Sequence, residues 1–222
     1  MPDPAVPHRC LRTVFCSETD TPDRVASILR FRKRILVDRL GWRLHVENGQ
    51  ECDEFDTPHA VHCAVLSGDE IIACFRAIRT DRPYLARSKF PFLATTHPYP
   101  VNPLIWEISR LAVSETARPF EVLLYAYSAV FHFARIRGAI SLVAFAEVAK
   151  ERLVTRIGIK TKLLGDPAEI GTDAYGRPIL CVAGELPLRD QGGPRFEKLM
   201  SYVAKMEIDD AATVLGRASI PA

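Results

Sequence analysis

The sequence predicts a single α/β domain with a mixed, mainly antiparallel sheet and helices on both sides of it. Two β-rich runs separated by Gly68-Asp69 predict an antiparallel hairpin. Strands and helices alternate later in the chain, an order typical of sheets covered by helices. The length of 222 residues suits one large domain that buries its own core without disulfides or metal.

The first elements expected are a helix and a hairpin. Thr21-Pro22-Asp23 is typical of a helix start, with a capping residue, a proline and an acid in the first turn. Apolar residues follow at helical spacing until Gly41, where we expect the helix to end. The hairpin strands are expected at residues 60–67 and 70–80, because Asp81-Arg82-Pro83 interrupts the second run.

The second half of the chain is expected to alternate strands and helices. A long apolar helix is expected at residues 119–137, followed by Gly138, and the uninterrupted apolar run at 139–146 is typical of a strand buried on both faces. We expect the domain to occupy residues 1–190, with a C-terminal helical extension over residues 191–222. The other expected elements are a short helix near 88–93, a strand at 105–113, a helix at 148–157, strands near 159–164 and 178–187, and a helix from Gly192 towards Lys205.

Composition and charge exclude several classes of protein. Hydrophobic residues at 48% and charged residues at 25% exclude disordered, collagen-like and coiled-coil chains. A net charge of +2 provides no global field for nucleic acid or a membrane. No apolar run approaches the ~20 residues that span a bilayer, and no signal-peptide pattern is present. Six cysteines without a CxxC pair predict reduced thiols in a cytoplasmic protein.

The distribution of charge is more informative than its sum. Residues 24–43 contain seven basic side chains and one acid, whereas residues 47–56 contain five acids and no lysine or arginine. Two solvated faces that neutralise one another are the commoner explanation for such runs. The alternative is a bipolar site for a zwitterion that carries a carboxylate and cationic groups.

Several details favour the bipolar site. Arg32 lies on the apolar stripe of its helix, so its guanidinium should point at the sheet, where a buried arginine needs an anion. Asp53 and Asp56 are three residues apart, which places both carboxylates on one side of a turn. Trp42 lies between the two blocks and can offer an aromatic face to a cation, although core filling is the commoner role of a tryptophan.

A second cluster of functional residue types lies at Trp106-Glu107-Ile108-Ser109-Arg110. In a regular strand Glu107 and Ser109 share one face, while Trp106 and Arg110 occupy the other. An acid in the middle of an apolar strand is costly to bury without a partner. Ion pairs among Glu107, Arg76 and Arg110 are one explanation. The other is that Glu107, directly or through one water, accepts a proton from a nucleophile.

Together these residues resemble the acyl-homoserine-lactone synthases, the autoinducer synthases of bacterial quorum sensing. The resemblance extends from about residue 28 to 187 and implies a fold like that of the GNAT N-acetyltransferases. It implies an enzyme that joins S-adenosylmethionine to an acyl thioester of acyl carrier protein or coenzyme A, releasing methylthioadenosine and an N-acyl homoserine lactone. The matching residues are Arg32, Asp38-Arg39-Leu40-Gly41-Trp42, Asp53-Glu54-Phe55-Asp56, Arg76 with Asp81-Arg82-Pro83, and Glu107-x-Ser109-Arg110.

The same resemblance implies roles in catalysis. Asp53 is expected at the amine and sulfonium end of the substrate, and Glu107 is the expected base, through water. Ser109 is expected beside the acyl group, and Arg110, like Arg32, is expected to organise the acids and the substrate carboxylate. Backbone N–H groups near a strand bulge are expected to hold the thioester oxyanion. The residues expected to bind S-adenosylmethionine are Arg32, Trp42, Asp53, Asp56 and Arg76.

The remaining expectations concern the acyl chain and the partners. No cofactor and no metal are implied, since S-adenosylmethionine and the thioester are substrates, and we expect a monomer that binds neither nucleic acid nor membrane. Two sets of residues are assigned, although core packing is the default explanation of the first and a solvated helix face the commoner explanation of the second. The acyl pocket is expected at Trp106, Leu123, Tyr127, Leu142, Ala144 and Phe145, and carrier docking at Lys150, Arg152, Arg156 and Lys160, with Lys162 nearby.

Other functions fit the sequence less well. Arg30-Phe31-Arg32-Lys33-Arg34 has the composition of a nucleic-acid patch, but the acidic block beside it opposes such binding. A zinc site built from His59, His62 and Cys63, with Cys52 upstream, is opposed by the alternation of side chains along a strand. A different GNAT-like acyltransferase using acyl-CoA, and a non-catalytic protein that binds an acyl carrier or adenosyl ligand, remain as alternatives.

Overall fold

The computed structural model describes residues 11–115, 118–172 and 176–212. Its main sheet has nine strands in the order β11-β1-β4-β5-β6-β7-β10-β8, with β9 paired to β10. Among the described strands, β1 with β11 and β6 with β7 pair in parallel, and the other neighbours of this sheet are antiparallel. The bounds are β1 Leu11–Cys16, β4 Val61–Ser67, β5 Glu70–Arg79, β6 Ile105–Val113, β7 Ser141–Glu147, β8 Lys162–Leu163, β9 Ala168–Thr172, β10 Pro178–Pro187 and β11 Met206–Asp210.

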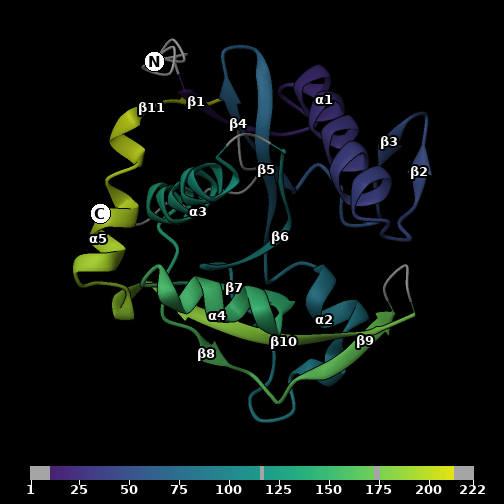
Figure 1. Ribbon diagram of the computed structural model, residues 1–222, viewed down its shortest axis with the longest axis vertical. Helices are drawn as coiled ribbons and strands as arrows, with labels where there is room; N and C mark the ends of the chain where they lie inside the picture. The colour runs from purple at the N-terminus through teal and green to yellow at the C-terminus, as the bar shows by residue number, and fades with distance from the viewer. Residues whose placement is uncertain (1–10, 116–117, 173–175, 213–222) are drawn as a thin grey trace, which may run out of the picture.

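Helices α1 (Pro22–Arg32) and α3 (Pro119–Ile136) cover opposite faces of this sheet (Figure 1). Alternation along β4 sends Cys63 and Val65 into the core beneath α3, whereas Ala64 packs in the core beneath α1. No helix among the described residues is long and apolar enough to cross a membrane. The helices are α1 Pro22–Arg32, a π-helix Lys33–Arg39, α2 Leu85–Lys89, α3 Pro119–Ile136, α4 Val148–Arg156 and α5 Pro194–Met200, with 3-10 turns at Pro91–Leu93, Leu188–Asp190 and Val203–Lys205.

The parallel strands β6 and β7 separate along their length. Their pairing is confined to three positions at the start of each strand: Ile105 with Ser141, Trp106 with Leu142, and Glu107 with Val143. Beyond these pairs the two strands diverge, and in Figure 1 β7 and β10 run across the direction of β4 and β5. The second half of β6 therefore has backbone groups on one edge that are not used by β7.

The small hairpin β2 (Val46–Glu47) and β3 (Gln50–Glu51) lies beside α1 (Figure 1). It turns through Asn48 and Gly49, which both have positive φ, at 49° and 74°. Two successive residues in this conformation make the tight turn whose twist matches that of the strands. The hairpin thereby returns the chain directly to the acidic residues that follow it.

The predicted fold class is confirmed, with local differences. The hairpin of β4 and β5, strand β6, helix α3 and strand β7 lie within a few residues of their expected positions. The helix expected to reach Gly41 instead changes at Lys33 into a π-helix, with bonds such as Leu40 N–H to Ile35 O at 3.1 Å. The sequence pattern gave no indication of β1, β2, β3, β9 or β11.

The described part of the C-terminal segment is built into the same sheet. Helix α5 packs on α3, where the rings of Phe131 and Phe196 meet edge to face with centroids 4.9 Å apart. Strand β11 pairs in parallel with β1 at the edge of the sheet. A helix alone was expected after Gly192, so the strand at Met206–Asp210 is an additional element.

Candidate active site

Six charged side chains meet between α1, the β2–β3 hairpin and the sheet, and we call them the charged network. Three are arginines and three are carboxylates, so their formal charges cancel. The side chains of Arg32, Arg76 and Glu51 have no exposed surface. Buried charges persist only where each has a partner of opposite sign, and here every member has one. The charged network consists of Arg32, Arg76, Arg110, Glu51, Asp53 and Asp56.

Arg32 is the last residue of α1 and points at the sheet, as its place on the apolar stripe predicts. Its Nε donates to Glu51 Oε2 at 2.5 Å, and its two Nη atoms donate to the two oxygens of Asp56 at 2.7 and 3.0 Å. Burial by itself would raise the pKa of Asp56, but Arg32 and Arg76 hold that pKa well below its usual value. Asp56 is therefore ionised throughout the physiological range.

Arg76, in the middle of β5, connects the two aspartates to the sheet. Its Nη atoms donate to the two oxygens of Asp53 at 2.5 and 3.1 Å, and Nη1 lies 2.8 Å from Asp56 Oδ1. Its Nε donates to Ser109 Oγ at 3.2 Å, across the β5–β6 pair. The planar guanidinium thus uses both of its edges, a geometry that lysine could not reproduce.

The two aspartates share one side of a turn, as their spacing predicts. Asp56 N–H donates to Asp53 O at 3.0 Å, and Asp53 N–H donates to Asp56 Oδ2 at 2.9 Å. Phe55 N–H donates to Asp53 Oδ1 at 2.9 Å. Side-chain oxygens that bind nearby backbone N–H groups in this way fix the local chain. Both carboxylates are therefore held in place before any ligand binds.

Arg110 differs from its predicted orientation. We expected it on the opposite face of β6 from Ser109, yet its Nε donates to Glu51 at 3.0 Å and its Nη2 to Asp53 at 2.6 Å. The cause is a β-bulge: Cys74 pairs with Ala112 and Arg76 with Ser109, so β6 carries one extra residue. Arg110 has φ of 55°, a conformation that non-glycine residues rarely adopt. The bulge turns its side chain into the charged network.

Glu107 is fully buried, and backbone N–H groups hold it rather than the arginines that the sequence analysis considered as ion-pair partners. Its Oε1 accepts from Ala86 N–H at 2.7 Å and its Oε2 from Leu85 N–H at 3.2 Å, both at the start of α2. Burial raises the pKa of Glu107, and the two backbone N–H groups and Arg76 reduce that rise. It faces the same side of β6 as Ser109, because the two pair with Ile78 and Arg76 of β5.

Trp42 lies on the loop after the π-helix, and its ring faces a cation of the protein itself rather than a substrate. That cation is Lys150 of α4, whose Nζ is 5.5 Å from the centroid of the indole ring. The loop is fixed by Trp42 N–H, which donates to Leu36 O at 2.9 Å. The contact connects the α1 side of the molecule with the end of β7, where α4 begins.

Two residues of the site were given no role in it by the sequence analysis. Glu51 was counted in the acidic block without a role, yet it is fully buried and pairs with Arg32 and Arg110. His62 of β4 is also fully buried, with Nε2 3.8 Å from Asp56 Oδ1 and no hydrogen-bond partner for Nδ1. Burial lowers the pKa of His62 to about 3, so the ring is neutral. The alternation of β4, with His62 directly opposite Arg76, could have placed it.

A cavity of about 300 Å³ opens beside the charged network. Asp53, Asp56 and His62 line one side of it, and the β2–β3 hairpin contributes Glu47 and Cys52. Val25 and Leu29 of α1, Glu18, Asn48 and Gln50 complete the lining. The cavity is thus rich in carboxylates, although those of Asp53 and Asp56 are already paired with arginines.

The residues expected to form one acyl pocket lie on both faces of β7. Leu142 and Trp106 pack in the core beneath α3, where Trp106 meets Phe133 edge to face at 5.1 Å, and Tyr127 packs against the same core. Phe145 packs instead against Phe90 on the opposite face, with centroids 4.8 Å apart. Phe145 is therefore separated from Leu142 by the sheet. Leu123 of α3 and Ala144 of β7 are half-buried.

The basic residues expected to dock a carrier are on the surface. Lys150, Arg152, Arg156 and Lys160 are all exposed. Lys150 is engaged by Trp42 and by Glu147, whose Oε1 is 2.6 Å from its Nζ. A cavity of about 470 Å³ lies nearby, lined by Lys160, Lys162 and Arg189 together with Thr161, Pro187 and Asp190.

Comparisons with known proteins agree with the resemblance read from the sequence. A family model described as autoinducer synthase matches residues 18–185. An acyl-homoserine-lactone synthase of Ralstonia nicotianae is 33% identical over 164 residues, 70% of this chain and 78% of that protein. Another from Acinetobacter nosocomialis is 31% identical over 155 residues, 65% of this chain and 84% of that protein.

Solved structures have the same fold. The CoA-dependent acyl-homoserine lactone synthase BjaI with MTA superposes with a TM-score of 0.78 at 24% identity, covering 90% of this chain and 93% of that chain. TofI, in a ternary complex with an inhibitor and MTA, superposes with a TM-score of 0.69 at 28% identity, covering 84% of this chain and 96% of that chain.

Proposed function

The chain belongs to the autoinducer synthase family, and on that premise we propose that it is an acyl-homoserine-lactone synthase. It transfers the acyl group of a thioester to the amine of S-adenosylmethionine and closes the product to an N-acyl homoserine lactone, releasing methylthioadenosine. The observation that carries this proposal is the buried charged network, whose formal charges sum to zero. It lies beside the bulge of β6, where β6 and β7 separate.

The charged network suits a zwitterionic substrate. S-adenosylmethionine carries a carboxylate, an amine and a sulfonium, so it needs groups of both signs close together. We assign its carboxylate to the arginine side, with Arg32 and Arg76, and its amine and sulfonium to Asp53, with Asp56 holding the arginines. We also assign Trp42 to the cationic end of the substrate, which would take the place of Lys150 over the indole ring.

Glu107 is the proposed base, acting through one water. An α-amino group has a pKa of about 7.7–8, and the nearby sulfonium lowers it, so a modest carboxylate base suffices. Burial raises the pKa of Glu107, so this pKa is closer to that of the amine that the carboxylate must deprotonate. The proton passes from the amine through this water to the carboxylate as the nitrogen attacks.

The bulge of β6 is the proposed place of acyl transfer. The amine nitrogen attacks the thioester carbonyl, and backbone N–H groups near Arg110 stabilise the oxyanion, with Ser109 beside the acyl group. Collapse of this intermediate breaks the carbon–sulfur bond, and the thiol leaves with one proton. Arg110 acts by holding Glu51 and Asp53 in position rather than by contact with the reacting atoms.

Lactone closure follows within the acylated product. One oxygen of the substrate carboxylate attacks the carbon next to sulfur, the carbon–sulfonium bond breaks, and methylthioadenosine leaves as a neutral thioether. A sulfonium is already a good leaving group, so positioning contributes more here than acid catalysis.

The acyl chain and its carrier complete the proposal. We assign the chain to the core of Trp106, Tyr127 and Leu142 beneath α3. The donor is acyl-CoA or an acyl carrier protein, and the exposed lysines and arginines of α4 would meet the acidic surface or phosphates of either. The chain works as a monomer in the cytoplasm, where its free cysteines stay reduced.

Release of methylthioadenosine tests the proposal. The full chain is incubated with S-adenosylmethionine and either acyl-CoA or acylated carrier protein, and the products are measured by mass spectrometry. We expect equal amounts of methylthioadenosine and acyl homoserine lactone. Acyl transfer without methylthioadenosine would support another GNAT-like acyltransferase, and binding of both substrates without turnover would support a non-catalytic protein.

A further inference from the structure

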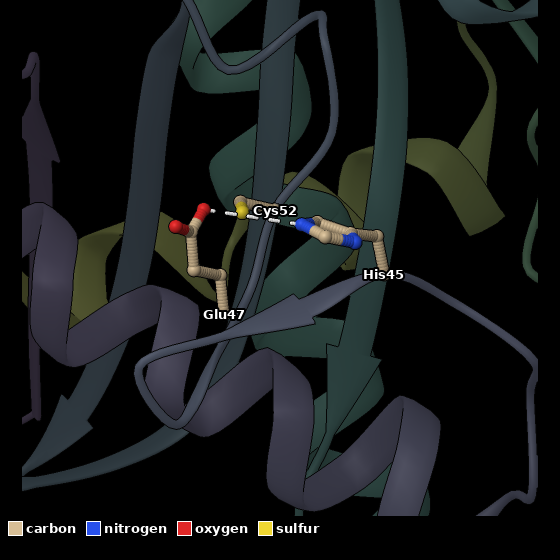
Figure 2. Close-up of side chains that lie close together, drawn as sticks. All are labelled: His45, Glu47 and Cys52. Carbon is tan, nitrogen blue, oxygen red and sulfur yellow. Dashed lines mark ion pairs between the residues drawn. The ribbon is translucent and has the colours of Figure 1, made fainter.

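The β2–β3 hairpin carries three side chains of metal-binding type on one face. Val46 pairs with Glu51, and Glu47 pairs with Gln50, so continuing this register places His45 opposite Cys52. Cys52 N–H donates to His45 O at 3.3 Å, in agreement with that register. Because side chains alternate along a strand, His45, Glu47 and Cys52 point the same way, as Figure 2 shows.

The ligand atoms of the three residues are already close together. His45 Nε2 lies 3.9 Å from Glu47 Oε2, and the ring nitrogen, carboxylate oxygen and thiol sulfur all lie within 4.8 Å of one another. Zinc bonds of about 2.0–2.3 Å in a tetrahedron require ligand atoms about 3.3–3.7 Å apart. The side chains of His45 and Glu47 are 67% and 68% exposed, so small rotations can close that difference.

The backbone that holds these ligands is preorganised. The turn residues Asn48 and Gly49 have φ values of 49° and 74°, which fix a tight hairpin. On the other strand, Glu51 and Asp53 flank Cys52, and both are anchored in the charged network by Arg110. The ligand set therefore stands on a short, rigid segment rather than on a mobile loop.

We propose that His45, Glu47 and Cys52 form a binding site for one zinc ion, with water as the fourth ligand. Imidazole nitrogen, carboxylate oxygen and thiolate sulfur are the three donor types that zinc takes from proteins. Zinc displaces the thiol proton to solvent and forms a zinc–sulfur bond. The thiolate and the carboxylate then balance the two charges of the ion. This site does not depend on the proposed activity and takes no part in the chemistry assigned above.

The surroundings of the thiol favour a cation. The carboxylates of Glu18 and Glu47 line the same cavity as the Cys52 thiol, and both attract a cation. This cavity of about 300 Å³ leaves space for the water ligand. Among the described cysteines, Cys52 is the one that is not buried, and Cys16, Cys63, Cys74 and Cys181 are enclosed in the core.

Cobalt(II) is the spectroscopic probe for this site, because a thiolate bound to cobalt absorbs in the near ultraviolet. The experiment uses a full-length Cys10→Ser variant, because Cys10 is the one cysteine outside the described residues and could also bind cobalt. We expect one equivalent of cobalt to produce the thiolate band and one equivalent of zinc to abolish it. Zinc should also slow alkylation of Cys52 by iodoacetamide, measured by mass spectrometry.

Variants of the hairpin identify the ligands. Cys52→Ser should abolish the cobalt band, and His45→Ala should lower zinc affinity in calorimetry by at least about tenfold, or about 1.4 kcal/mol. Glu47→Gln should weaken binding in the same direction. His59→Ala, which removes another exposed histidine nearby, should bind as the parent does. The proposal is overturned if no thiolate band forms, if Cys52→Ser retains it, or if His45→Ala binds like His59→Ala.

Discussion

Arg76 Nε donates to Ser109 Oγ at 3.2 Å, and the residue after Ser109 is the positive-φ Arg110 of the β-bulge. The last regular pair between β5 and β6 before the bulge is thus the one that carries this hydrogen bond. Because Arg76 also binds Asp53 and Asp56, the serine sits between the charged network and the edge of β6 that β7 leaves unpaired.

The substitution Glu107→Gln tests the proposed base. A neutral amide cannot take the amine proton, so we expect lactone formation to fall by about 10²–10⁴-fold. The amide oxygen can still accept from one of the two backbone N–H groups of α2, so the circular dichroism spectrum should be retained. In the parent enzyme, protonation of Glu107 should abolish activity as the pH decreases. Because the pKa of Glu107 is raised, this loss should occur at a higher pH than it would with an ordinary glutamate as the base. Activity of Glu107→Gln equal to that of the parent would show that the base lies elsewhere.

Asp53→Asn tests the assignment of the substrate's cationic end. The change leaves Arg76 and Arg110 with weaker partners, and we expect S-adenosylmethionine binding and lactone formation both to be lost, as measured by calorimetry and mass spectrometry. Glu54→Gln is the matched control. Its carboxylate is exposed and pairs with Lys89 outside the charged network, so its substitution should leave binding unchanged. Equal effects of the two substitutions would refute the assignment.

The positive φ of Arg110 predicts an unusual order of stability. Both Arg110→Ala and Arg110→Gly remove the ion pairs to Glu51 and Asp53, but only glycine adopts φ of 55° without strain. Arg110→Gly should therefore be more stable than Arg110→Ala by about 1 kcal/mol in urea denaturation. In an ordinary strand position, alanine would be the more stable of the two.

His62 predicts how stability changes with pH. Burial lowers its pKa to about 3 in the folded state, below the 6.5 of an ordinary histidine, so between these two pH values the unfolded chain binds the proton more strongly. Stability should rise with pH across that window, by up to about 1.4 kcal/mol per unit. In urea titrations between pH 5 and 6.5, His62→Gln should show a flatter dependence than the parent. An identical slope would show that His62 titrates in the folded protein.

The exposed basic residues of α4 predict how an acyl carrier protein docks. Replacing Arg152 and Arg156 by glutamate should raise KM for acyl carrier protein, with an effect that weakens as salt is added. Lys198→Glu, a charge reversal on the exposed face of α5, is the control and should not change KM. If the control raises KM as much, then docking does not use α4.

Much of the site could be predicted from local pattern. The helical stripe placed Arg32 against the sheet, the spacing of Asp53 and Asp56 placed both carboxylates on one turn, and strand alternation placed Glu107 beside Ser109. Each of these depends on neighbours within one element, where period and spacing are fixed by backbone geometry.

Features that depend on pairing between distant segments could not be read in this way. The extra residue that reverses Arg110 exists only in the register of β6 against β5. Strand β11 is stabilised by β1, almost two hundred residues earlier, and not by a pattern of its own. The partners of Glu51 are two arginines from different elements. Long-range contacts of this kind override local propensity.

The equal number of positive and negative groups in the charged network has a consequence for its affinity for the substrate. Three guanidinium groups and three carboxylates already satisfy one another, so an incoming zwitterion must replace existing contacts instead of adding to them. Such an exchange yields a small net gain in free energy, since each new attraction is offset by one that is broken. Binding of S-adenosylmethionine should consequently be selective yet weak. Weak binding lets the product methylthioadenosine dissociate readily.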